Sequence, residues 1–330
     1  MESLKFIKRP KLKNPYLIVA WPGMGEVAFK AAKYLVEQLH AKEFAEIPPH
    51  DFFYLTGSTI KAGLVSLPEL PESKFYYWKN PEGRKSGSPD AHDCIIFLSN
   101  AQPDLARADA YSKLILKVAE LYRVTMVIGM ASMPQAIDHS QDPAVWYVAT
   151  SKEVSERLRQ IHLNKLSEGQ ISGMNGLFLG VAKSSGFQGF CLLGEIPLYT
   201  IQIENPKASF AVLEALCRIL AIKVDLAPLA EQVHMMEGEI NKMLDYLKVG
   251  SQGTPPPIGE DEIEKIKKSL SQLTKLPLSV KEKIDKLFTQ AKGDISKANE
   301  LKIELDKWSV YKEYEDKFLD LFKKPKGKEN

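Results

Sequence analysis

Two glycines, Gly23 and Gly25, form the first pattern in the sequence that could bind a ligand. The segment Ile18–Ala28 reads IVAWPGMGEVA, in which an apolar run leads into Gly-x-Gly-x-x-Ala and a helical pattern. In dinucleotide-binding turns, such glycines let the backbone approach a pyrophosphate at a helix N-terminus. Trp21 and Pro22 weaken this interpretation. A phosphate loop has small residues and free N–H donors at these positions, whereas Trp21 is bulky and Pro22 has no backbone N–H.

A dinucleotide site also needs an acidic residue about twenty positions further on, which binds the ribose. The candidates are Glu43 and Glu46, and neither clearly ends a second strand. Because a glycine turn alone is a weak signal, we favour a structural turn around Met24 and keep nucleotide binding as the less favoured alternative.

A second glycine-rich segment, Gly169–Gly180, reads GQISGMNGLFLG. Its glycines, Gly173 and Gly176 among them, predict a tight turn that opens a helix, with Ser172 or Asn175 able to cap the first turn. The backbone N–H groups of such a turn can bind an anion. The favoured interpretation is structural: small side chains let the helix approach a neighbouring strand closely.

The third segment, Gly189–Tyr199 (GFCLLGEIPLY), brings Glu195 to the carboxyl end of a predicted buried strand. Open α/β sheets place their ligands at that edge. Asn100, Gln102 and Ser132 follow two other predicted strands and are expected at the same edge. Together these segments predict a crevice for a ligand or partner, with the candidate residues Trp21, Pro22, Gly23, Met24, Gly25, Asn100, Gln102, Ser132, Gly173, Asn175, Gly176 and Glu195.

Recognisable catalytic motifs are missing from the sequence. There is no Gly-x-Ser-x-Gly elbow, no HExxH pair and no P-loop, and the six histidines are scattered. Asp90, His92 and Asp93 lie close together, but their place between a polar loop and a strand favours solvated loop residues. We therefore expect no catalytic residue, no cofactor and no metal site, and only a triad assembled from distant positions stays open.

The composition is that of a globular protein without affinity for polyanions. Of 330 residues, 44% are apolar and 26% charged, and 44 Lys and Arg against 42 Asp and Glu leave a net charge of +2. Because a near-neutral chain has no global field to attract nucleic acid or an anionic membrane, neither partner is expected.

Cysteine usage and hydropathy predict a cytoplasmic protein. The three cysteines, Cys94, Cys191 and Cys217, are widely spaced, and their odd number suggests no disulfide framework. No apolar stretch approaches the length of a membrane-spanning helix, and the run Tyr16–Trp21 is too short for the core of a signal peptide.

Short apolar runs alternate with helical patterns over most of the chain. Strands are predicted at Leu17–Trp21, Phe75–Trp78, Cys94–Leu98, Thr125–Ile128, Val145–Ala149 and Gly189–Leu193. Helices are predicted at Glu26–His40, Ala106–Tyr122, Lys152–His162, Lys207–Ala221 and Leu229–Leu247. Continuous apolar strands that alternate with helices predict a three-layer α-β-α fold with a mainly parallel sheet covered on both faces.

A break in composition near Gly250 predicts an α/β domain over residues 1–249, a linker over 250–259 and a C-terminal α-helical extension over 260–330. The linker reads GSQGTPPPIG, and its prolines and glycines exclude regular structure. Beyond it, apolar stripes at helical spacing predict three amphipathic helices, at Ile263–Leu273, Val280–Phe288 and Leu301–Leu321. We expect these helices to form either a small bundle that packs on their own chain or an arm that lies on a neighbouring subunit. The first alternative is slightly favoured.

Three glycine-containing segments, in this order, resemble the family of the second proteasome-assembly chaperone and its archaeal and bacterial relatives. The resemblance rests on Val19–Gly25 (VAWPGMG), Ile171–Gly176 (ISGMNG) and Cys191–Glu195 (CLLGE), the last followed by Pro197 and Tyr199. It spans about Leu4–Leu247 and leaves out the helical extension.

The resemblance implies a three-layer domain, similar in architecture to nucleoside phosphorylases and hydrolases, that self-associates and binds proteins without catalysing a reaction. Archaeal members end in a hydrophobic–Tyr–any tail that docks into the proteasome. This chain ends KPKGKEN, so docking by that route is not expected. We therefore predict a homo-oligomeric assembly or adaptor protein with an unidentified protein partner. The alternative is a small-molecule (nucleoside- or nucleotide-like) binding protein, or a phosphorylase- or hydrolase-like enzyme, that uses the crevice.

Overall fold

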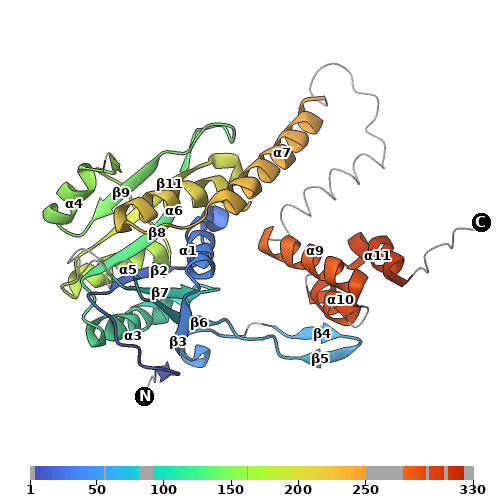
Figure 1. Cartoon of the computed structure of the whole chain (residues 1–330), viewed down its shortest axis with the longest axis horizontal. Helices are drawn as coiled ribbons and strands as arrows, with labels where there is room; N and C mark the ends of the chain where they lie inside the picture. The colour runs from blue at the N-terminus through green and yellow to red at the C-terminus, as the bar shows by residue number, and fades with distance from the viewer. Residues whose placement is uncertain are drawn as a thin grey trace, which may run out of the picture. The chain divides into compact units, whose positions relative to one another are not determined.

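The computed structural model describes residues 4–55, 57–81, 92–161, 163–249, 278–294, 297–307 and 311–322 (Figure 1). The chain divides into two compact units, residues 1–237 and 238–330. The predicted linker, 250–259, and the first predicted helix of the extension, Ile263–Leu273, lie outside the described residues. No helix within the described ranges is long and apolar enough to cross a membrane.

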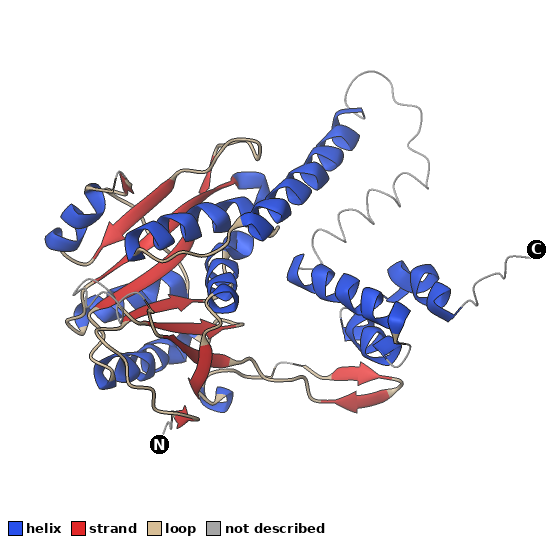
Figure 2. Ribbon diagram, in the orientation of Figure 1, coloured by secondary structure: helices blue, strands red, loops and turns tan. Residues whose placement is uncertain are grey.

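The first unit alternates strands and helices (Figure 2). Its strands are β1 (Lys5–Phe6), β2 (Tyr16–Ala20), β3 (Lys42–Glu46), β4 (Thr59–Lys61), β5 (Leu64–Ser66), β6 (Ser73–Trp78), β7 (Cys94–Ser99), β8 (Met126–Gln135), β9 (Val145–Ala149), β10 (Asn164–Lys165) and β11 (Gly189–Pro197). Its helices are α1 (Val27–Gln38), α3 (Ala108–Leu121), α4 (Lys152–Arg159), α5 (Met174–Ser184) and α6 (Pro206–Leu220), and α7 (Ala227–Val249) begins in it. The structure contains every strand and helix predicted for this part and adds short strands, among them β3, β4 and β5.

Nine of the strands form one mixed sheet in the order β1-β3-β6-β7-β2-β8-β11-β9-β10. The central strands β7, β2, β8 and β11 are parallel to one another, whereas β6 is antiparallel to β7 and β9 is antiparallel to β11. The predicted α/β fold is therefore confirmed, with a sheet that is less parallel than predicted. Parallel neighbours need a crossover connection, and in the described residues between β3 and β6 the chain carries only a 3-10 turn and the β4–β5 hairpin.

Alternate residues of the central strands face opposite layers of helices. In β2, Ile18 and Ala20 belong to one apolar cluster, and Leu17 and Val19 belong to the other. Side chains alternate along a strand, so a strand that is covered on both faces must be apolar at every position. The sequence of β2, YLIVA, meets this condition.

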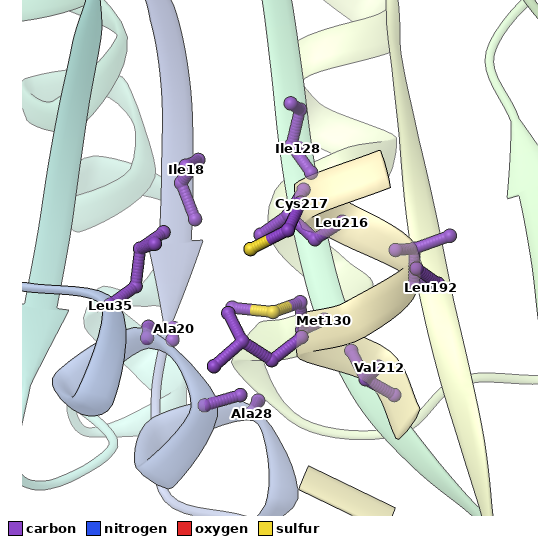
Figure 3. Close-up of a cluster of buried hydrophobic side chains, with 14 of the residues drawn as sticks. Ile18, Ala20, Ala28, Leu35, Ile128, Met130, Leu192, Val212, Leu216 and Cys217 are labelled. Carbon is purple, nitrogen blue, oxygen red and sulfur yellow. The ribbon is translucent and has the colours of Figure 1, made fainter. Parts of the chain in front are cut away.

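Two pairs of helices cover the sheet. Helices α1 and α6 pack on the face that carries Ile18 and Ala20, and Figure 3 shows their side chains meeting those of β2, β8 and β11. Helices α3 and α5 pack on the opposite face, where Tyr111 and Phe178 are fully buried. The three-layer arrangement predicted from the sequence is therefore present.

The second unit contains α9 (Leu278–Gly293), α10 (Lys297–Lys307), α11 (Tyr311–Leu319) and a 3-10 turn at Asp320–Phe322. These helices share an apolar cluster of their own, which includes Ile284, Phe288, Leu301, Leu305 and Phe318. The described part of the extension is helical, as predicted, and its third apolar stripe is divided between α10 and α11.

Candidate functional site

The loop Trp21–Gly25, which directly follows β2, forms the centre of the predicted crevice. Trp21 is fully buried, and its ring centroid lies 5.5 Å from those of Phe97 in β7 and Phe178 in α5. Met24, by contrast, is exposed. The indole therefore anchors the loop in the core, and the chain reaches the surface within three residues.

Asn175, in the first turn of α5, holds the backbone of Trp21. Its Oδ1 accepts a hydrogen bond of 3.0 Å from the Trp21 N–H, and its Nδ2 donates one of 3.0 Å to the Trp21 carbonyl. The β2–β8 ladder ends at the pair Val19–Gly129. Beyond that pair, the side-chain amide of Asn175 takes the place of a strand as the hydrogen-bond partner of the Trp21 backbone. Both bonds are buried and satisfy backbone groups that water does not reach.

Gln102 ties the same loop to the start of α5. Its Nε2 donates to the Pro22 carbonyl over 2.7 Å, and its Oε1 accepts from the Met174 N–H over 3.2 Å. Gly173 adopts a φ of +71°, and a Cβ at this position would lie 2.8 Å from the Gln102 Oε1. Glycine is therefore required at 173 both by the backbone conformation and by the neighbouring amide.

Gly176, in the first turn of α5, lies against the segment that leads into the helix. A Cβ at this position would lie 2.1 Å from the carbonyl oxygen of Ile171. The close approach expected from the small side chains is therefore present, but the neighbour is this preceding loop and not a strand.

Two backbone donors of the glycine turn bond within the protein. The Gly25 N–H donates to the Ile201 carbonyl over 2.9 Å, and the Glu26 N–H donates to the Gly23 carbonyl over 2.9 Å. A phosphate loop needs such N–H groups for its ligand. The acidic candidate Glu46 ends β3, which β6 and β7 separate from β2. Both features argue against a dinucleotide-binding turn.

A cavity of about 380 Å³ opens beside this loop, and we call it the loop cavity. Of the predicted residues, those that line it are Gly23, Met24, Gln102, Ser132, Gly173 and Asn175. The hydroxyl of Ser132 donates to the Met24 carbonyl over 2.7 Å. The wall also contains Ala131, Met133, Pro134, Gln135, Leu166, Glu168, Gly169, Gln170, Ile171, Ser172 and Leu193. Several of these follow Ser132 in β8, which runs further than the predicted Thr125–Ile128 and so extends the wall.

Asn100 and Glu195 do not line the loop cavity, and each holds another part of the backbone. The Asn100 Oδ1 accepts from the Glu72 N–H over 2.8 Å. The Glu195 carboxylate accepts from the Ala144 N–H over 3.0 Å and from the Trp146 Nε1 over 2.8 Å. Glu195 therefore fastens the segment before β9 to β11.

The buried thiols are poor nucleophiles. Burial raises the pKa of Cys94, Cys191 and Cys217 to about 12, so each stays protonated at neutral pH. Within the described residues, no group of three or more His, Cys, Asp or Glu is placed to hold a metal ion. The side chain of Asp93 instead accepts from two backbone N–H groups.

A second cavity, of about 550 Å³, is lined by α6, α7 and the segment before β9. The Lys207 Nζ lies 2.7 Å from the Glu237 Oε1 and donates to the Ser140 carbonyl over 2.9 Å. Beside it, the Tyr199 hydroxyl lies 2.8 Å from the His139 Nδ1. No sequence motif signals this cluster, because its members lie far apart in the chain and come together only through the packing of α6 and α7.

Comparison with known proteins gives one consistent family. The model of the PAC2 family matches residues 17–244 of this chain. An uncharacterized protein of Methanocaldococcus jannaschii is 28% identical over 255 residues, which cover 74% of this chain and 90% of the relative. The family match ends before the predicted linker, as expected from the resemblance.

Two solved structures from Pyrococcus furiosus are similar to this one. PbaB, described as an archaeal proteasome activator, aligns with a TM-score of 0.62 at 27% identity, over 73% of this chain and 99% of PbaB. PbaA, described as an archaeal homolog of proteasome-assembly chaperone, aligns with a TM-score of 0.55 at 23% identity, over 73% of this chain and 96% of PbaA. The resemblance to proteasome-assembly chaperones is therefore confirmed.

Asn175→Ala removes both side-chain bonds to Trp21 and leaves a buried N–H and a buried carbonyl unpaired. We expect it to lower the free energy of unfolding by about 2–5 kcal/mol, because each buried unsatisfied group costs about 1–3 kcal/mol. Chemical denaturation of the full chain measures the loss. The matched control, Ser172→Ala, changes an exposed neighbour and should alter the value by less than about 0.5 kcal/mol. Equal losses in the two variants would contradict this role of Asn175.

Replacing two glycines of α5 by alanine should change the stability of the protein in opposite directions. Gly176→Ala forces the helix away from Ile171 and should destabilise the protein by about 1–3 kcal/mol. Gly180→Ala adds a Cβ that meets nothing within 4 Å and should stabilise it by about 0.5–1 kcal/mol, since alanine is the better helix former. Thermal unfolding monitored by circular dichroism distinguishes them. A stabilising Gly176→Ala would show that the contact with Ile171 is not close.

Proposed function

The chain belongs to the PAC2 family, and from that premise we propose that it is a non-catalytic assembly or adaptor protein for a protein complex of the proteasome type. The observation that carries the proposal is the similarity to PbaB, described as an archaeal proteasome activator, at 27% identity over 99% of PbaB. That alignment covers 73% of this chain.

The chemistry of the crevice supports binding over catalysis. Asn175, Gln102 and Ser132 all bond to the backbone of the loop Trp21–Gly25. A side chain that holds a loop in place is not available to move a proton or attack a substrate without releasing that loop. These three polar residues therefore act best as supports for the loop.

We propose that the predicted domains have different roles in binding. The α/β body, residues 1–249, would self-associate and contact the protein partner in the cytoplasm, without nucleic acid or membrane. The extension, residues 260–330, would be an added contact module beyond the linker, 250–259. Its support is that the family match ends at residue 244, whereas α9, α10 and α11 form an apolar cluster of their own.

Reconstitution with the proteasome core particle of the same organism tests the proposal. On mixing the purified full chain with the core particle, we expect a joint peak in size-exclusion chromatography and a change in the rate of peptide hydrolysis. The physical reason is that a bound adaptor alters assembly of the ring or access to its entrance.

The control for this experiment is an unrelated protein of similar mass, which should neither co-elute nor change hydrolysis. The absence of both effects with the full chain, at concentrations where it remains folded, would overturn the proteasome assignment. Affinity capture from the source organism then identifies the complex that the chain does bind.

The loop cavity supports a second candidate function, the binding of a nucleoside-like small molecule. Its volume of about 380 Å³ falls within the range of small-molecule pockets. The loop cavity also lies at the carboxyl ends of the parallel strands, beside the end of β2. In the sheet, β2 lies between β7 and β8. Open α/β sheets bind ligands at the carboxyl ends of such strands.

A thermal-shift screen against nucleosides, nucleotides and acyl metabolites tests this alternative. A ligand at one hundred times its dissociation constant should add about 2.7 kcal/mol to the free energy of unfolding. Ser172→Trp, which places a ring at the cavity wall, should abolish the shift, and Leu105→Trp, at a residue that is 84% exposed elsewhere, should retain it. A shift that survives Ser172→Trp would place the ligand outside the loop cavity.

A further inference from the structure

A third cavity, of about 550 Å³, lies where β9 ends and α4 begins, and we call it the lysine cavity. Figure 1 shows α4 next to β9. Its wall is formed by the end of β9, the first turn of α4, residues 165–167 and Lys183 of α5. Leu166 also belongs to the wall of the loop cavity, whereas the second cavity has no wall residue in common with it.

Three lysines line this cavity, Lys152, Lys165 and Lys183. The carboxylate among the wall residues belongs to Glu156, and its Oε2 pairs with the Arg159 Nη2 over 3.1 Å. Within the parts of the chain that the structure describes, none of the three lysines forms a salt bridge. The whole chain has a net charge of only +2, so the lysine cavity is a local concentration of uncompensated positive charge.

The second cavity also contains a lysine, but the charge of that lysine is neutralised. The Lys207 Nζ lies 2.7 Å from the Glu237 Oε1 and 3.4 Å from the Asp142 Oδ1. An anionic ligand would have to displace one of these carboxylates to reach the ammonium group. The lysine cavity imposes no such competition, because its carboxylate is paired with an arginine.

Neutral hydrogen-bond donors accompany the lysines. Ser151 caps α4, because its Oγ accepts from the Val154 N–H over 3.2 Å. The other N–H groups of a first helical turn have no partner within the helix, and they favour an anion nearby. Among the described residues, the Ser167 hydroxyl has no hydrogen-bond partner. The helix end therefore adds donors to a site that the three lysines define.

The buried residue Tyr147 of β9 holds the walls of the lysine cavity together. Its ring is fully buried, and its hydroxyl donates to the Ser155 carbonyl of α4 over 3.0 Å. Its own carbonyl accepts from the Leu166 N–H over 3.0 Å. One residue thus joins β9 to α4 and to the segment that carries Lys165. Binding to such preorganised walls costs little ordering of the backbone.

We propose that the lysine cavity binds the phosphate group of a small molecule, either inorganic phosphate or a phosphate ester. A phosphate monoester carries a charge of about −1.5 to −2 at neutral pH and three acceptor oxygens, which match three ammonium donors. Lysine binds phosphate as a point charge. The volume of about 550 Å³ is typical of small-molecule pockets and leaves room for an organic part against Val148 and Leu166.

A phosphate group fits this cavity better than an acidic segment of a protein does. Such a segment brings its carboxylates one after another, each with one charge, and would match lysines in a row. Lys152, Lys165 and Lys183 instead come from α4, β10 and α5 and surround one space. The inference involves neither a protein partner nor a ligand in the loop cavity, so it is independent of the proposed function.

Isothermal titration calorimetry of the full chain, in a phosphate-free buffer of low ionic strength, tests the proposal. The probes are inorganic phosphate, pyrophosphate and glycerol phosphate, and glycerol is the uncharged control. We expect saturable binding of a phosphate probe and none of glycerol. Equal affinities for inorganic phosphate and glycerol phosphate would mean that the cavity recognises the phosphate group alone. Tighter binding of glycerol phosphate would mean that the organic part contributes as well.

Variants of the full chain locate the binding site. Lys165→Gln and Lys183→Gln each remove one charge from an exposed side chain, and we expect each to weaken binding by about ten-fold, because a charge-assisted hydrogen bond is lost. Lys165→Glu should abolish binding. The matched control, Lys117→Gln, changes an exposed lysine of α3 that lines none of the three cavities and should bind like the wild type. Ser172→Trp, which alters the loop cavity, should also retain binding.

Three results would overturn the proposal. The first is that none of the three phosphate probes binds to the folded wild-type chain. The second is binding that Lys165→Gln and Lys183→Gln both leave unchanged, which would place the anion elsewhere. The third is lysine-dependent binding of a polyglutamate peptide without binding of any phosphate probe, which would assign the cavity to an acidic protein segment.

Discussion

The two hydrogen bonds between the Asn175 side chain and the Trp21 backbone are the constraint on which the carboxyl edge of the sheet depends. They fix where the chain leaves β2, and the buried indole fixes how deeply the loop is anchored. Gln102 can then reach both Pro22 and Met174 only because position 173 is a glycine. Side-chain amides thereby hold together the end of β2, the loop that follows it and the start of α5, where the β2–β8 ladder has ended.

The central layers could be predicted from the sequence because burial on both faces leaves an unambiguous pattern. In β7, CIIFLS, every residue is buried, and no polar residue interrupts the apolar run before Ser99. The strand β3, KEFAE, gives no such signal, because its glutamates reach the surface at the antiparallel flank and its conformation depends on pairing with β6. The sequence also gives no sign of the division between α10 and α11, since both helices contribute to the same apolar cluster.

The site was only partly predictable, for a different physical reason. Strand order in the chain indicates which residues reach the carboxyl edge, but an Asn or Gln amide suits a ligand and a backbone equally well. Asn175 and Gln102 were therefore placed at the correct edge without any indication that their partners are Trp21 and Pro22. For Glu195 the missing information was the antiparallel pairing of β9 with β11, which brings the Trp146 indole to the carboxylate.

Polar side chains of the α/β body that hydrogen-bond to its loops are not available to contact a partner. If the protein binds partners as proposed, exposed apolar area such as that on the β4–β5 hairpin would supply part of the free energy of association. Aliphatic contacts provide affinity without selectivity, so recognition of a particular client requires charged groups elsewhere. Within the described residues, the rim of the second cavity supplies such groups, because Lys207 and Glu237 come from different helices and stand beside the exposed Asp142. Under the proposed function, affinity and selectivity would therefore come from different surfaces.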